Sequence, residues 1–139
     1  MASTTERQTT FNGLPISTAI TYLLKANSTV LAGTLGMQVA GKTQKAATGQ
    51  TGAVLLGVAQ STYANTTGSD VTRTAPMVFK RGYCYLKNSG NDPVVAADLG
   101  GPVLVEDEDT VKTGTAGAGD MVVTALEIQG TQVLCLVGP

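Results

Sequence analysis

Short apolar runs, some of which alternate with polar residues, lie along the chain, and turn-forming residues separate these runs. The clearest runs are residues 53–62 (AVLLGVAQST), 77–87 (MVFKRGYCYLK), 121–128 (MVVTALEI) and 132–139 (QVLCLVGP). A period of two is typical of strands with one buried face. Gly57 and Gly82 lie inside two of the runs, where glycine commonly marks a bulge or a barrel corner. The pattern predicts an all-β fold: a single small β-barrel or sandwich of about eight short strands.

The N-terminal part of the chain is less regular. Residues 1–18 are polar and are broken by Gly and Pro, so we predict an extended N-terminal arm there and a β-barrel domain over 19–139. Residues 19–26 (AITYLLKA) fit both a strand and a helical stripe, and their Thr, Tyr and Ile favour the strand. We expect a broken strand pair over 30–41 and a polar loop over 42–52.

The arm contains more apolar residues than a purely solvated tail. Phe11, Leu14, Pro15 and Ile16 lie within it. They would either pack against their own domain or reach a neighbouring molecule. We select these four residues as candidate contacts with a neighbouring molecule.

The composition supports the strand pattern. Hydrophobic residues make up 42% of the chain, but only 4% are aromatic and 14% are charged. Val, Leu, Ala, Thr and Gly therefore dominate, and too few Glu and Lys remain to cover amphipathic helices. No apolar run reaches the ~18 residues of a membrane span, and MASTTERQTT lacks the apolar centre of a signal peptide. We expect a protein that is made in a cytosol and does not bind membranes.

Charge and residue types argue against two large function classes. The net charge is −1 and no basic cluster occurs, whereas nucleic-acid binding needs Lys and Arg to neutralise phosphates. The chain has no histidine, the commonest general base and metal ligand at neutral pH. The glycines of residues 114–120 (GTAGAGD) lack the GK[ST] ending of a phosphate-binding loop. We therefore expect neither an enzyme nor a cofactor.

Four consecutive carboxylates form the most conspicuous candidate site. Glu106, Asp107, Glu108 and Asp109 stand between the apolar runs of VLVEDEDTVK. Calcium loops alternate oxygen donors with spacers, whereas consecutive residues on a strand turn point to opposite sides. A weak divalent site remains an alternative, but we expect a solvated hairpin tip without a metal.

Two cysteines lie far apart in the sequence, inside the apolar runs YCYL and VLCLV. Cys84 and Cys135 could form a disulfide. Because each lies in an alternating run, we favour buried free thiols on two strands.

Several segments, taken in order, resemble a known family: the small β-barrel head-decoration (capsid cement) proteins of tailed bacteriophages. The segments are LGVAQ at 56–60, KRGYCYLK at 80–87, ADLGGPVLVEDEDTV at 97–111 and VLCLVGP at 133–139, with a weaker match in TVLAGTLGMQV at 29–39. The resemblance extends over residues 20–139 overall, and residues 1–19 match nothing in the family pattern.

The resemblance implies a structural virion protein on the capsid exterior. Its partner would be the major capsid protein, and it would stabilise the head by bridging neighbouring capsid subunits. The resemblance also implies a homo-oligomer, with a trimer favoured, and no catalytic residues. The alternative is a β-module of a phage tail, baseplate or fibre, although the absence of Trp gives little support to a glycan-binding version.

Overall fold

The computed structural model describes residues 16–20, 23–73 and 75–138, with side chains from residue 23 onward. The fold is all-β, as the sequence predicted, and η1, a single 3-10 turn at Ala96–Asp98, is its only helical element within the described residues. The strands are β1 (Ile16–Ile20), β2 (Leu23–Leu24), β3 (Ser28–Val30), β4 (Leu35–Val39), β5 (Lys42–Lys45), β6 (Val54–Ala59), β7 (Tyr63–Asn65), β8 (Val71–Thr72), β9 (Met77–Asn88), β10 (Pro102–Val105), β11 (Thr110–Lys112), β12 (Val122–Gln129) and β13 (Gln132–Val137).

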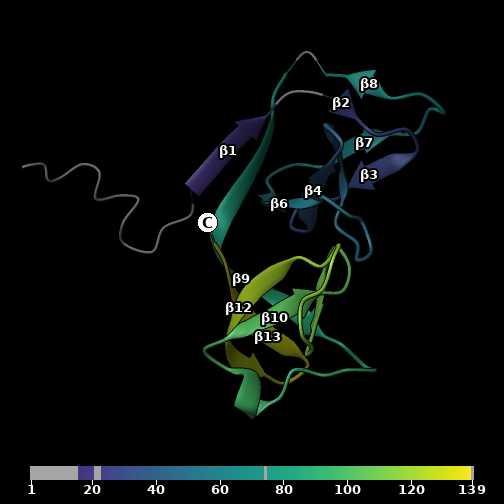
Figure 1. Cartoon of the computed structure of the whole chain (residues 1–139). Coiled ribbons are helices and arrows are strands. Elements are labelled where there is room, and N and C mark those ends of the chain that lie inside the picture. The colour runs from purple at the N-terminus through teal and green to yellow at the C-terminus, as the bar shows by residue number, and fades with distance from the viewer. Residues whose placement is uncertain (1–15, 21–22, 74, 139) are drawn as a thin grey trace, which may run out of the picture.

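Five strands close into a small barrel. Their order is β9, β13, β12, β10 and β11, and β11 returns to pair with the end of β9 in parallel. All the other pairs in the barrel are antiparallel. Closure removes the free edges that an open sheet of this size would expose. Figure 1 shows this barrel as the lower part of the molecule, in green and yellow.

The longest strand, β9, belongs to both parts of the molecule. Its first half pairs with β1 and β6, and its second half pairs with β13 and β11. From β6 the sheet continues through β4, β5 and β2 to β8, while β3 and β7 form a separate two-stranded sheet. In Figure 1 β9 descends from this upper part into the barrel. The two parts therefore share one continuous backbone segment.

Two glycines permit the exchange of partners along β9. Gly82 has φ +145° and stands where β9 leaves β6 and begins to pair with β13. Gly57 has φ +129°, and a Cβ there would lie 2.5 Å from the carbonyl oxygen of Lys80. The register of β6 against β4 shifts next to Gly57, so that Leu56 is the extra residue of a bulge. The predicted bulge or corner glycines are thus confirmed.

The molecule has two hydrophobic cores. The barrel core contains Leu86, Val103, Val111, Val133 and Cys135, with Leu35 and Met37 of β4 packed against them. The small core is formed by Leu24, Val30, Leu56, Ala59, Tyr63, Met77 and Phe79. Alternation along β9 changes phase near Gly82, because Met77 and Phe79 are buried on one side of it and Leu86 beyond it. Opposite faces of β9 consequently serve the two cores.

The prediction of a polar loop over 42–52 was wrong at its beginning. Lys42–Lys45 forms β5 and pairs with β4, with Val39 opposite Lys42. Ala40 and Gly41 connect the strands with φ of 51° and 79°, as in a two-residue type I′ hairpin. Ala-Gly is a weaker hairpin signal than Asn-Gly, and Thr43 and Gln44 are polar although both are buried.

The first predicted strand is confirmed on either side of residues 21–22, as β1 and β2. The expected arm boundary at residue 18 falls inside β1, which begins at Ile16. The structure contains more strands than the eight expected, because several pairs of only two or three residues flank the turns. No helix in the described part of the chain has the length and apolar content needed to cross a membrane.

Candidate interaction surface

The outward side of the barrel carries an apolar surface, which we call the outer barrel face. It is formed by side chains that alternate with core residues on four strands, and its members are Tyr83, Tyr85, Pro102, Val122, Leu134 and Leu136. The exposed fractions are 56% for Tyr83, 47% for Tyr85 and 46% for Val122. Large apolar side chains are thus left in water beside one another.

Strand pairing brings these side chains together. Tyr83 stands opposite Leu136 and Tyr85 opposite Leu134 across the β9–β13 pair. On the other side of β13, Thr124 stands opposite Leu136, and Pro102 is the next partner in the same row. Directly opposed side chains on one face of a sheet lie about 4.5–5.5 Å apart at Cβ. The surface is therefore continuous from β9 to β10.

A hollow deepens the outer barrel face at one end. It has a volume of about 510 Å³ and is lined by Pro102, Val122, Val123, Thr124, Leu136 and Gly138. The hollow is mostly aliphatic and offers no charged group. Such a shape suits an inserted apolar side chain better than a polar metabolite.

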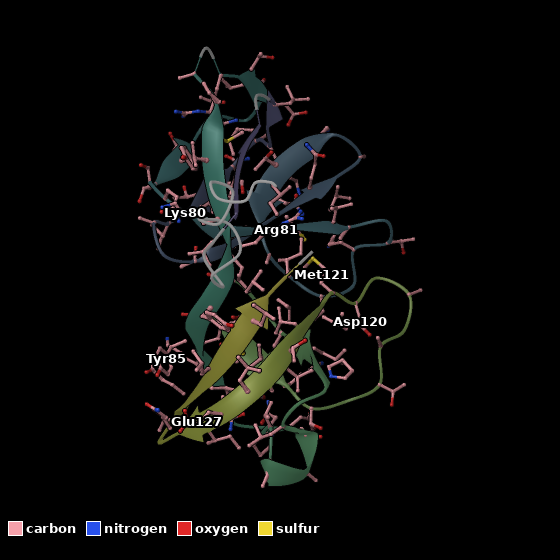
Figure 2. The ribbon with its side chains drawn as sticks, turned by 90° about the vertical axis from the view of Figure 1, so that its left-hand side faces the viewer. Lys80, Arg81, Tyr85, Asp120, Met121 and Glu127 are labelled. Carbon is pink, nitrogen blue, oxygen red and sulfur yellow. The ribbon has the colours of Figure 1, made fainter. Side chains whose placement is uncertain are left out.

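Charged residues border the apolar surface at opposite ends. Figure 2 shows Lys80, Tyr85 and Glu127 in succession along one side of the molecule. Lys80 and Glu127 are both exposed, and the ion pairs found among the described residues involve other side chains. Arg81 points differently: its Nε and Nη2 donate to the carbonyl oxygens of Leu56 and Leu55 at 3.3 and 3.4 Å. Arg81 thereby caps the bulge of β6.

The sequence reasoning did not select the outer barrel face, although a signal existed. In YCYL, tyrosines occupy one face of the strand while Cys84 and Leu86 occupy the other. The last strand, QVLCLV, is likewise apolar on both faces. A strand at the surface of a small barrel normally has one polar face. Two neighbouring strands without a polar face indicate a surface that is covered by something else.

The four carboxylates connect β10 to β11 as a hairpin, which confirms the predicted turn. The turn is not fully solvated, however, since all four residues are half-buried. The backbone oxygen of Glu108 accepts from the amide of Leu35 at 2.8 Å, and Asp107 forms a bridge with Ala47. The turn therefore docks onto the sheet of β4 and β5 rather than projecting into solvent.

Each carboxylate of the turn has its own partner. Glu106 accepts from the Ser89 hydroxyl at 2.7 Å, and Asp109 pairs with Lys87 at 3.1 Å. Glu108 lies 3.9 Å from Lys45. The oxygens thus engage separate donors, and no group of three metal-ligating His, Cys, Asp or Glu occurs in the part of the chain that the structure describes.

Two carboxyl groups in this turn have shifted pKa values. Burial raises the pKa of Asp107, against the opposing effect of a hydrogen bond from the amide of Asp109. Burial would also raise the pKa of Asp109, but hydrogen bonds from Lys87 and Thr110 outweigh it and lower that pKa. The charged form of Asp109 is therefore stabilised where its ion pair with Lys87 fastens the turn to β9.

The cysteines face each other across β9 and β13, with Cys84 directly opposite Cys135. Both are free thiols, as the sequence predicted. Burial raises the pKa of Cys84 to about 11. Burial and the neighbouring Cys84 thiol raise the pKa of Cys135 to about 12. Cys135 belongs to the barrel core and the half-buried Cys84 packs against it, and the raised pKa values disfavour the reactive thiolate form of both.

The candidate contact residues from the sequence fall mostly outside the described residues. This applies to Phe11, Leu14 and Pro15. Ile16 begins β1, and its backbone stands opposite Arg81. Because β13 ends at Val137 opposite Gly82, the described chain begins beside the end of the outer barrel face. Figure 1 likewise places the C-terminal end next to the start of β1.

Comparison with known proteins gave no match to a family model, a curated protein or a solved structure.

Proposed function

We propose that the protein is a virion component that binds the outer surface of a tailed-bacteriophage capsid and stabilises it by bridging neighbouring major capsid protein subunits. The observation that carries the proposal is the ordered series of segments that resembles head-decoration proteins. In this fold KRGYCYLK lies within β9, ADLGGPVLVEDEDTV runs from η1 to β11, and VLCLVGP includes all of β13 except Gln132. These three segments are neighbours in the barrel, whereas LGVAQ and TVLAGTLGMQV lie outside it, in β6 and around β4.

The surface of the barrel supports a binding role over a chemical one. The outer barrel face is apolar, and its hollow carries no titratable side chain. Neither cysteine is accessible as a thiolate. A protein of this kind acts through the area that it buries, and many copies on one particle add their modest affinities by multivalency. We propose a non-enzymatic protein located on the virion exterior.

The proposal includes a small homo-oligomer, with a trimer favoured. An oligomer placed where several capsid subunits meet contacts each of them at once, and this simultaneous binding increases residence time without new contacts. A single subunit would then bind the head reversibly, whereas the oligomer would dissociate from it very slowly.

The test is co-sedimentation of the purified protein with expanded heads that lack it, titrated to saturation. Binding in a fixed ratio to the major capsid protein is the expected result, and the ratio gives the symmetry of the binding position. Binding to unexpanded heads, measured in parallel, shows whether the protein requires the surface of the expanded capsid. No binding at micromolar concentration by folded protein would contradict the proposal. Labelling of tails rather than heads in micrographs would instead favour a tail, baseplate or fibre module.

A further inference from the structure

We infer that the outer barrel face is the surface through which copies of this chain associate with one another. This inference rests on the proposed function, which includes a small oligomer, and identifies the residues that would form its subunit contact.

The centre of the face has the residue types of a subunit contact. Tyr83 and Tyr85 are about half exposed and lie beside Leu134 and Leu136. Tyrosine is enriched among the residues that contribute most to protein–protein affinity, since a large ring is buried with few rotatable bonds. The hollow beside Leu136 can accept an apolar side chain from the partner. The two tyrosines, the two leucines and the hollow together form an uneven apolar surface at the centre of the face.

The ends of the face identify a second copy as the partner. Lys80 lies beyond one end, and Glu127, which pairs with Leu134 across β13, lies at the other. Strand geometry places their backbones roughly 15–20 Å apart, too far for an ion pair within one chain. When two copies meet through this surface, the Lys80 end of one can face the Glu127 end of the other. The face is therefore complementary to itself in charge.

The size of the molecule permits such a contact. A stable interface buries about 800 Å² on each partner. That area is roughly a tenth of the 7072 Å² surface of the described structure, and the face extends over four strands. The pairing of opposite ends is satisfied both in a two-fold dimer and in a closed ring. A mass measurement gives the number of copies.

The experiment is sedimentation equilibrium of the full chain, in the absence of heads, up to about 100 µM. Unmodified protein should have the mass of two or more copies. Tyr85→Lys should raise the dissociation constant at least 10-fold. Val95→Lys, at an apolar residue that is 50% exposed outside the face, should leave it unchanged. Circular dichroism and thermal unfolding establish that each variant is folded.

Charge reversal gives a second readout that a folding defect cannot imitate. Lys80→Glu and Glu127→Lys should each weaken association about 10-fold, and combining them should restore it to within about 3-fold. Failure of the double variant to recover would overturn the assigned contact. A monomeric wild type would also overturn it. In that case, association appearing only after removal of residues 2–15 would identify the chain's own N-terminal segment as the occupant.

The two proposals fail separately. Variants that are monomeric but still saturate heads would leave the capsid function standing. Association through this face without any binding to heads would leave the subunit contact standing and remove the function.

Discussion

The two cores differ in composition and in what organises them. The barrel core is aliphatic apart from Met and Cys, and it is enclosed by strands that close on themselves. The small core depends on two aromatic rings, Tyr63 and Phe79, whose centroids are 5.8 Å apart. Closure fixes the barrel through its backbone, whereas the packing of large side chains, two of them aromatic, fixes the small core. Strand β9 therefore joins two units that are stabilised in different ways.

The largest expected effect comes from Phe79→Ala. Phe79 is fully buried, and its ring occupies the space above Gly36 that a side chain there would need. Removing a buried Phe usually costs about 3–5 kcal/mol in the free energy of unfolding. Hydrogen exchange should rise in β3, β6 and β7 while β12 and β13 stay protected.

Leu86→Ala is the matched change in the barrel core, on the same strand. It should cost about 2–5 kcal/mol and raise exchange in β12 and β13 instead. If both variants increased exchange equally throughout the sheet, the two cores would be one cooperative unit and the comparison would fail.

Gly57→Ala tests the junction between the cores. Its φ of +129° and the Lys80 carbonyl 2.5 Å from a Cβ leave no room for a side chain. We expect a loss of about 2–4 kcal/mol in urea unfolding, from strain and displaced backbone. Gly68→Ala, at an exposed glycine with no atom within 4 Å of its Cβ, should change stability by less than about 0.5 kcal/mol. Similar losses of stability in Gly57→Ala and Gly68→Ala would mean that the backbone at the junction shifts to accommodate the added methyl group.

These elements also show how far the sequence could lead. Alternation predicted β9, β12 and β13 because each has a buried face, and the glycines inside β6 and β9 were correctly expected at irregular positions. β5 could not be predicted, since its buried Thr43 and Gln44 resemble loop residues. The outer barrel face could not be located from one strand alone. It depends on the register that sets Tyr83 beside Leu136.

A smaller, pH-dependent effect is expected where the carboxylate turn meets β9. Asp109 has a lowered pKa, so its ion pair with Lys87 stabilises the fold above the ordinary Asp value of about 3.9. That contribution disappears as the pH falls through the lower pKa of the folded state. Because both side chains are partly exposed, Asp109→Asn should cost only about 0.5–1 kcal/mol at pH 7.

The measurement is urea unfolding of wild type and Asp109→Asn at neutral pH and near pH 2, where the difference should vanish. Lys87→Met and the double variant complete a cycle that isolates the pair. A difference between wild type and Asp109→Asn that persists in acid would assign the effect to packing rather than to charge.

The smallest effect is one of access and requires no substitution. Both cysteines lie in the barrel, and their raised pKa values of about 11 and 12 leave little thiolate at pH 8. Labelling with a thiol reagent should be at least about 100-fold slower in the native protein than in urea. Under mild denaturant that opens only the small core, the thiols should stay unlabelled. Labelling of the thiols when the small core opens would show that the two cores unfold as one cooperative unit.

The position of β9 in the middle of the chain has a consequence for synthesis. All strands that enclose the small core precede residue 88, while β10 to β13 follow it. A ribosome therefore delivers the complete small core before it has made most of the barrel. During that interval the second half of β9 exposes Leu86 and an unpaired edge. Because closing the barrel must wait for β10 to β13, it should be the last step of folding and the moment of greatest risk of aggregation.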